Sequence, residues 1–302
     1  MTMRIRNTIA AFLLMTAFAL SGNAQNALSF TRIDRNPRTS AMAGAGIASV
    51  QSSWHGAFGN AAQLGFQQGK VYTGVGMQLW ELNNEVDKST NLHAGAGLRF
   101  GNFAVALGGA YQMGTAGTQS TYTPNDLLLA IGLAYNIEEV VSIGLNARYA
   151  TQRFTREAGV NGYSFDLTVI GRITPALSAA VGVGNIGNKV KGSDDFYGQP
   201  AYAHGGLAWK PALTAEHSVE VLLDGEYNFD GSFAATLGAE YAYNQVVYAR
   251  AGYRYASEKA VIPSHLGVGL GLRFGHTRVE ASYLTASPIL ANTINLGVAF
   301  NF

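Results

Sequence analysis

The sequence of 302 residues contains no cysteine, which excludes disulfides and a lipid-modified N-terminal cysteine. Charged residues make up only 13% of the chain, against about a quarter in ordinary soluble domains. The formal net charge of +1 argues against nucleic acid as a partner. Beyond the first 24 residues, no apolar run is long enough to cross a membrane as a helix. These shortages disfavour a water-soluble domain, a nucleic-acid binder and a helical membrane protein.

Glycine and aromatic residues are abundant instead, with 37 glycines, 15 tyrosines and 15 phenylalanines. At the start of the chain, two arginines precede an apolar run at 9–20, and small residues follow at Gly22 and Ala24. This order predicts a secretory signal peptide, residues 1–24, with a short membrane anchor as the alternative. An exported chain without a spanning helix can still cross a membrane as a closed β-barrel.

Apolar side chains alternate with small or polar ones in segment after segment. In 264–274, for example, Leu266, Val268 and Leu270 share one face, and glycines and Arg273 occupy the other. This period of two is typical of strands with one apolar face. Fourteen such segments are predicted, at 70–82, 90–100, 103–111, 125–135, 141–151, 162–173, 177–186, 202–211, 217–227, 233–243, 247–255, 264–274, 277–284 and 293–302.

The predicted fold is therefore all-β: a fourteen-stranded antiparallel transmembrane β-barrel over residues 70–302. Connections after the even strands are short, and most of those after the odd strands are longer and more polar, which is typical of outer-membrane barrels. We expect an integral protein of the outer membrane of a Gram-negative bacterium, in contact with lipid, with both termini periplasmic.

The final segment, "TINLGVAFNF", places Ile294, Leu296, Val298, Phe300 and Phe302 on one face. We expect this strand to close the barrel against the first one and to turn these side chains toward lipid. A terminal aromatic residue after such a strand resembles the signal that the outer-membrane assembly machinery reads. The alternative is a well-packed edge strand.

Residues 25–69 do not alternate. The stretch "SFTRIDRNPRTSAMAGAGIAS" resembles the opening of the PorV/PorQ family, a branch of the group that includes the FadL-type fatty-acid transporters. The stretch "WHGAFGNAAQLGF" is similar to the family's Asn-Pro-Ala-x-Leu element, except that Ala61 replaces proline and its fixed φ. The residues that match the pattern are Arg38, Met42, Gly44, Gly46, Ala48, Asn60, Ala62 and Leu64.

The small residues of "AMAGAGIAS" allow close backbone packing, so we predict that 25–69 form an N-terminal plug in or under the barrel. The resemblance implies the same, since this region closes the lumen in FadL-type relatives. An extended linker is the alternative.

Charged residues occupy inward positions of the predicted strands. Acids concentrate on the ninth and tenth strands and bases on the eleventh and twelfth, where neighbouring strands can pair them. The pattern predicts a ladder of salt bridges that fills the lumen, or alternatively a conducting or substrate-selective pore. The predicted lumen set is Arg148, Asp166, Arg172, Glu220, Asp224, Glu226, Glu240, Arg250, Arg254, Arg273, Arg278 and Glu280.

Catalytic and metal-binding patterns find no support, so neither an enzyme nor a cofactor is expected. The six histidines are scattered without ligand spacing, and no Gly-x-Ser-x-Gly element occurs. Asp194 and Asp195 lie in a long predicted loop, where they solvate it or bind a divalent cation weakly.

Three functions compete. The PorV/PorQ resemblance implies docking of protein partners in type IX secretion or surface attachment, either secretion components or the C-terminal signal domains of cargo. FadL-like uptake of hydrophobic molecules, with a bound amphiphile or lipid, is the second. A structural subunit of another outer-membrane complex is the third. Outer-loop side chains that could make such contacts are Phe154, Phe196, Tyr197, Ile262, Ile289 and Leu290.

Overall fold

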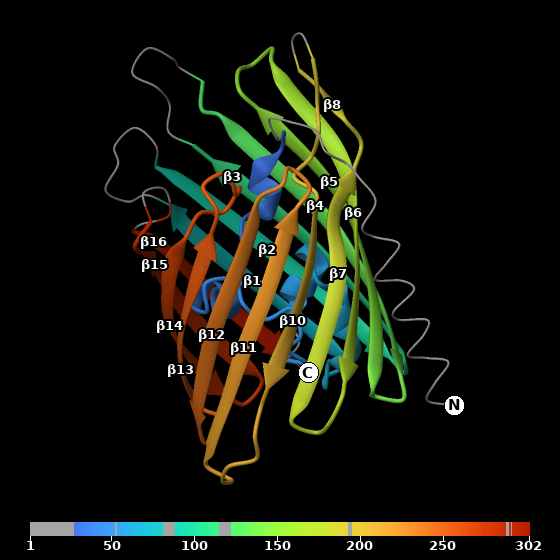
Figure 1. Cartoon of the computed structure of the whole chain (residues 1–302), viewed down its shortest axis with the longest axis vertical. Coiled ribbons are helices and arrows are strands. Elements are labelled where there is room, and N and C mark those ends of the chain that lie inside the picture. Colours follow the sequence, from blue (N-terminus) through green and yellow to red (C-terminus); the bar gives the residue numbers. More distant parts are fainter. Residues whose placement is uncertain are drawn as a thin grey trace.

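The computed structural model describes residues 27–51, 53–80, 88–114, 122–192, 195–287, 290 and 292–302. The predicted signal peptide lies outside these residues. The described chain forms a closed antiparallel barrel (Figure 1) whose order along the wall is β1-β16-β15-β14-β13-β12-β11-β10-β7-β6-β5-β4-β3-β2. No helix in the described part is long and apolar enough to cross a membrane. The predicted fourteen-stranded barrel is confirmed.

The barrel strands and their bounds are β1 (Val71–Trp80), β2 (Ser89–Phe100), β3 (Phe103–Met113), β4 (Asn125–Ile137), β5 (Val141–Arg153), β6 (Gly159–Arg172), β7 (Leu177–Gly187), β10 (Tyr202–Trp209), β11 (His217–Asn228), β12 (Phe233–Tyr243), β13 (Val247–Ala256), β14 (His265–Phe274), β15 (Thr277–Thr285) and β16 (Thr293–Asn301).

The first and last strands close the barrel. Pairing of β1 with β16 runs from Tyr72 opposite Asn301 to Leu79 opposite Ile294. The backbone N–H groups of Lys70 and Val71 also donate to the carbonyl of Phe302, at 2.6 and 3.0 Å. Because the barrel is closed, its wall has no free sheet edge. A structure that crosses lipid requires this, since every backbone polar group there must find a hydrogen-bond partner within the protein. The prediction that 293–302 close the barrel against the first strand is confirmed.

The outer surface of the barrel is apolar. Leu107, Leu237 and Leu270 are among the exposed side chains of the wall, and exposed aromatic rings such as Phe103 and Tyr135 lie at strand ends, with 4.7 Å between their centroids. Because charged side chains facing outward are few, this surface suits hydrocarbon with aromatic residues at its borders.

Most strand bounds lie within two residues of the prediction, and the larger differences are at two places. The hairpin of β5 and β6 extends beyond the predicted ends, to Arg153 paired with Gly159. A small hairpin, β8 (Val190–Lys191) with β9 (Phe196–Tyr197), lies where the sequence predicted only loop. Both pairings lie at the end of the barrel with the long connections, the loop end. Strands that project from the membrane need no apolar face, so alternation does not reveal them.

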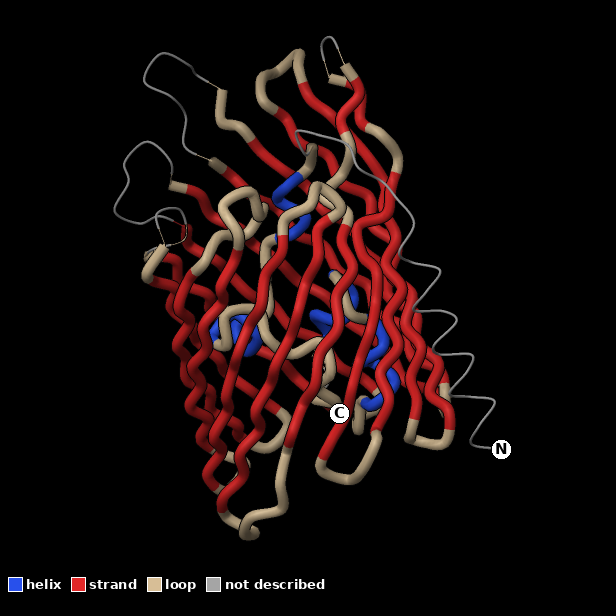
Figure 2. Tube along the Cα trace, viewed as in Figure 1, coloured by secondary structure: helices blue, strands red, loops and turns tan. Residues whose placement is uncertain are grey.

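Residues 27–69 lie inside the barrel and contain four short helical elements (Figure 2), namely η1 (Ser29–Arg32), α2 (Pro37–Ala41), η2 (Trp54–Phe58) and η3 (Ala61–Phe66). The sequence starts α2 locally. The side chain of Asn36 accepts a hydrogen bond from the Arg38 N–H, and Pro37 occupies the first helical position. Gly44, at φ +92°, and Gly46, at φ +139°, then allow the turn that follows α2.

Glycines in the wall let this segment approach the strands closely. A Cβ added at Gly144 would lie 1.9 Å from the backbone nitrogen of Ala62, and one at Gly252 would lie 2.4 Å from the carbonyl of Met42. Backbone therefore packs on backbone at both positions, which only a residue without a side chain permits.

The described N-terminal segment crosses the lumen from one end to the other. The Ala27 N–H donates to the carbonyl of Gly198 in the loop before β10, whereas Phe302 lies at the opposite end, among the short turns (the turn end). Ala27 and Phe302 therefore lie at opposite ends of the barrel, whereas the N-terminus, which the sequence predicted on the same side as the C-terminus, lies outside the described residues. Counting strands predicts on which side of the barrel β1 begins and β16 ends. It does not predict the path of the segment that spans the lumen before β1.

Candidate functional site

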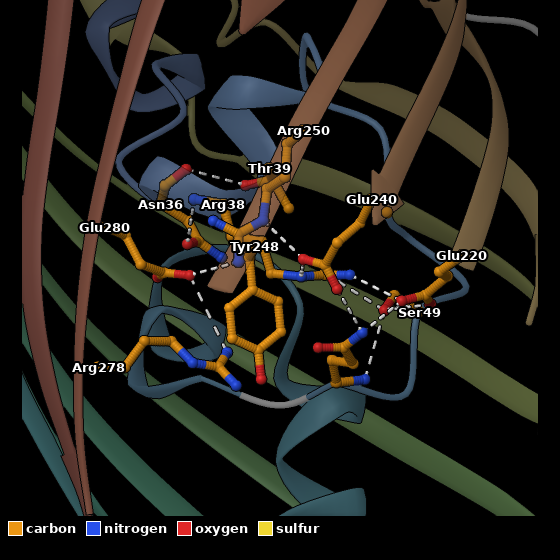
Figure 3. A network of polar contacts seen from close by, with 12 residues as sticks. Asn36, Arg38, Thr39, Ser49, Glu220, Glu240, Tyr248, Arg250, Arg278 and Glu280 are labelled. Carbon is orange, nitrogen blue, oxygen red and sulfur yellow. Dashed lines mark hydrogen bonds and ion pairs between the residues drawn. The ribbon is translucent and has the colours of Figure 1, made fainter. Parts of the chain in front are cut away.

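An arginine of the N-terminal segment lies between two buried carboxylates of the wall (Figure 3). Arg38 in α2 bonds Glu220 of β11 through Nη2, at 2.8 Å, and Glu240 of β12 through Nε, at 2.9 Å. Glu220 and Glu240 are directly opposite each other in the strand register. Like charges at such positions destabilise a sheet. Arg38 supplies the positive charge that makes the arrangement tolerable.

The network extends along the wall on both sides of Arg38. Arg250 of β13 lies opposite Glu240 and bonds it at 2.6 Å, and it also bonds Glu280 of β15 at 2.8 Å. From the N-terminal segment, the Ser49 hydroxyl donates to Glu220, and the Gln51 amide donates to both Glu220 and Glu240. Burial alone would lower the pKa of Arg38, but Glu240 and Glu220 raise it above its ordinary value. Arg38 is therefore charged throughout the physiological pH range.

Three further wall carboxylates hold the segment nearer the loop end. Asp224 accepts hydrogen bonds from the N–H groups of Gly46 and Ile47, at 2.6 and 3.0 Å. Glu226 bonds both Arg32 of the segment and Arg254 of β13, each at 2.8 Å.

The third carboxylate, Asp166 of β6, pairs with Arg148 of β5, whose Nη1 donates to the carbonyl of Phe58. The predicted ladder of salt bridges thus exists, but the N-terminal segment forms part of it.

Two arginines of the predicted lumen set, Arg172 and Arg273, stand apart from this network, and a third, Arg278, reaches it only at its edge. Arg172 lies over the ring of Phe66, 4.6 Å from its centroid, near the turn end. Arg273 is exposed there and bonds the carbonyl of Gly275 at 3.4 Å. Arg278 reaches Glu280 only at 4.0 Å. The alternating pattern places these side chains on the inner face of the barrel wall. That inner face extends beyond the part of the lumen that the N-terminal segment fills.

The residues of the family pattern serve the packing of the segment. Met42, Ala48, Ala62 and Leu64 are fully buried. The Asn60 amide donates to the carbonyl of Ile47 at 3.0 Å, which ties the two halves of the segment together. The sequence analysis named Arg38 through this pattern and Glu220 and Glu240 through alternation, but it did not predict that they pair with one another.

The backbone N–H of Ala61, a group that proline would lack, forms a hydrogen bond. This N–H donates to Asn146 Oδ1 at 2.9 Å, while the amide nitrogen of Asn146 donates to the carbonyls of Gly56 and Ala57 at 2.8 Å each. Since Asn146 is 1% exposed, this acceptor cannot turn to water instead. The departure from the family pattern therefore matches a specific hydrogen bond of this chain.

A cavity of about 250 Å³ lies between the segment and the part of the wall toward the loop end. Its apolar lining comes from the segment, two strands and two loops: Ile33, Phe58, Trp80, Ile262, Leu284 and Leu290. Arg35 and three members of the network, Arg148, Asp224 and Glu226, are among the polar groups of the lining. The sequence analysis named Ile262 and Leu290 of this lining as outer-loop side chains, but it could not join them to the rest, because the walls of the cavity come from residues far apart along the chain.

The candidate outer-loop side chains do not gather into one patch. Phe154 and Phe196 are exposed, at 51% and 64%, and Tyr197 is half-buried in β9. Leu290 is 5% exposed and turns into the cavity, as does Ile262 from its loop. Ile289 lies outside the described residues, as does Asp194.

The described histidines form no metal site, and no group of three metal-ligating side chains occurs in the described chain. His55 and His93 approach each other, with ring centroids 5.5 Å apart, beside Trp54. Burial lowers the pKa of His55 well below its ordinary value, so its ring is neutral at physiological pH. The pair packs as part of the buried cluster of aromatic rings.

We predict that Arg38→Met lowers the free energy of unfolding by about 3–5 kcal/mol, the usual cost of leaving a buried charge without its partner. Unfolding of the purified protein in urea measures the loss. Arg273→Met is the matched control, because Arg273 is exposed and forms no ion pair within the described chain. Equal losses in the two variants would contradict the role assigned to Arg38.

Ala61→Pro should lower the free energy of unfolding by about 1–3 kcal/mol, because it leaves the buried Asn146 oxygen without a donor. Proline's fixed φ suits the first position of η3, so the substitution does not strain the backbone there. The variant therefore tests the loss of the N–H group. Ala61→Gly keeps the N–H and should cost less. A proline variant as stable as the original protein would show that this hydrogen bond contributes nothing.

Comparison with known proteins yields structural matches alone. No family model and no curated protein sequence matches the chain. The solved structure of the "CymD monoaromatic hydrocarbon channel" matches with a TM-score of 0.67 at 15% identity, covering 88% of this chain and 97% of that one. The Ralstonia pickettii toluene transporter TbuX matches with a TM-score of 0.60 at 13% identity, covering 88% of this chain and 98% of that one.

A Pseudomonas aeruginosa FadL homologue matches with a TM-score of 0.58 at 11% identity, again covering 88% of this chain and 98% of that one. At such identities the likeness concerns the fold. The wider resemblance to FadL-type barrels is thereby confirmed as a structural one, whereas these comparisons give no support to the narrower PorV/PorQ resemblance. The chain shares the fourteen-stranded barrel fold of FadL-type channels.

Proposed function

We propose that this chain is an outer-membrane barrel of the FadL-like type that admits small hydrophobic or amphiphilic molecules and catalyses no reaction. The observation that carries the proposal is the cavity of about 250 Å³ at the loop end, which the N-terminal segment closes from below. A molecule that enters from outside meets this cavity first. The names of the structural neighbours, hydrocarbon and toluene channels, support the same class of cargo.

The wall beside the cavity has an irregular strand pairing, which we propose as the place of a sideways route. Among the described strands, the register of β6 and β7 shifts at one place, where Gly184 and Asn185 lie opposite Asp166. Asn185 has a φ of +57°, and β10 pairs with β7 only as far as Gly184. A bulge of this kind weakens the local ladder. Arg148, the partner of Asp166, lines the cavity, so the weak point and the cavity are adjacent.

The orientation follows from the connections. We place the turn end and the C-terminus in the periplasm and the cavity toward the outside of a Gram-negative outer membrane, since long loops face outward in such barrels. Membrane lipid then contacts the exposed apolar side chains of the wall, and Ala27 lies near the outer surface.

Uptake of radiolabelled toluene by cells that express the chain tests the proposal. We expect uptake several-fold faster than in cells without it. Ile262→Trp should abolish the gain because the larger side chain fills the cavity that Ile262 lines. Leu270→Trp, on the lipid-facing side of β14, should leave the gain intact. Uptake equal to that of cells without the chain, or loss in both variants, would refute the proposal.

A docking function is the second candidate, in type IX secretion, in surface attachment or in another outer-membrane complex. The exposed rings of Phe154 and Phe196 at the loop end favour it. Gentle extraction of the tagged protein from its native membrane and identification of what remains bound tests this function. A stoichiometric secretion component or cargo signal domain, lost in a Phe154→Ser and Phe196→Ser variant, would support docking, and a chain that purifies alone would exclude it.

A further inference from the structure

Arg35 is a buried cation without an acidic partner. Its side chain belongs to a residue only 3% exposed and lines the cavity. Nη1 and Nη2 donate to the carbonyls of Ile33 and Phe30, at 2.9 and 3.0 Å, and Nε has no partner in the described chain. Within the described chain Arg35 forms no ion pair, unlike Arg32, Arg148 and Arg254 around the same cavity.

Each carboxylate that lines the cavity already has partners of its own, although one oxygen of Asp34 (Oδ2) and one of Asp224 (Oδ1) have none in the described chain. Glu226 bonds two arginines, and Asp224 accepts from two backbone N–H groups. Asp34, next to Arg35 in the chain, accepts from the Asn36 N–H and the Thr39 hydroxyl at 3.0 Å each and forms no ion pair with Arg35. The positive charge of Arg35 is therefore not offset by direct contact with an acid.

The surroundings make this charge unfavourable. Burial and the neighbouring Arg148 lower the pKa of Arg35 to about 10, although Asp34 and Asp126 act in the opposite direction. Arg35 still remains charged at neutral pH. An anion in the cavity would relieve this cost through a charge-assisted hydrogen bond, whereas a plain hydrocarbon would displace water and leave the charge unanswered.

The rest of the cavity limits the size and character of the anion. Ile33, Phe58, Trp80, Ile262, Leu284 and Leu290 supply apolar surface beside Arg35. A cavity of about 150 Å³ is enough to hold benzene. The observed volume of about 250 Å³ thus suits one ring, or a few carbons, together with a carboxylate, and excludes a long acyl chain in a single compact site.

We propose that the cavity binds a small organic carboxylate, of the size of benzoate, with its carboxylate on Arg35 and its apolar part on the surrounding aliphatic and aromatic side chains. The inference rests on the proposed function, because it names the chemical class that occupies the same cavity. Guanidinium is well suited to this role, since its donors match the geometry of a carboxylate.

Calorimetric titration of the purified full chain in detergent tests the inference. The probes are benzoate, benzyl alcohol as the neutral molecule of similar size, and inorganic phosphate as the anion without an apolar group. We expect benzoate to bind at least several-fold more tightly than either. Arg35→Met should remove the preference over benzyl alcohol, Arg35→Lys should keep part of it, and Arg273→Met should leave it unchanged.

Each other outcome counts against the inference. Equal binding of benzoate and benzyl alcohol overturns the role of Arg35, as does a preference for benzoate that survives in Arg35→Met. Phosphate that binds as tightly as benzoate overturns the role of the apolar side chains. If Arg35→Met does not fold, Ile262→Trp keeps Arg35 and must still abolish benzoate binding. Benzyl alcohol binding without an anion preference would leave the uptake function standing, whereas binding of neither organic probe would count against both.

Discussion

The structure depends on a pair of buried acids that the arginine of the wall cannot neutralise without the N-terminal segment. Glu220 and Glu240 stand opposite each other on β11 and β12, and Arg250 alone, shared with Glu280, cannot balance both. Arg38 supplies the additional positive charge. Breaking a buried ion pair from one side costs several kcal/mol. The barrel wall and the segment inside it are therefore one folding unit rather than a pore with a removable stopper.

This constraint also determines where a ligand can be bound. Arg38 holds α2 and Asp224 holds the turn that follows it, so the segment fills the middle of the lumen. The cavity described above lies toward the loop end. Wall glycines such as Gly144 and Gly252 make the close packing below the cavity possible. The cavity thus results from how far the segment fills the barrel, and its charged lining, apart from Asp34 and Arg35, comes from the contacts that anchor the segment.

Much of the fold follows from simple periodicity in the sequence. Alternation predicted the fourteen strands because lipid on one side imposes it on every strand, but it could not reveal the β8–β9 hairpin or the polar extension of β5 and β6, which lie outside that constraint. Counting back from the turn between β11 and β12 would have placed Glu220 opposite Glu240 and shown that a cation was needed. That Arg38 supplies it depends on the path of a segment without periodicity, which local sequence does not determine.

A double-mutant cycle between Arg38 and Glu220 tests the central claim most directly. The free energies of unfolding of Arg38→Met, Glu220→Gln and the double variant would be compared with that of the original protein. If Arg38 neutralises the acid pair, the double variant is more stable than Arg38→Met alone, because the carboxylate left without a partner has been removed. Losses that simply add would contradict the claim and would make the contact incidental to the way the segment is held.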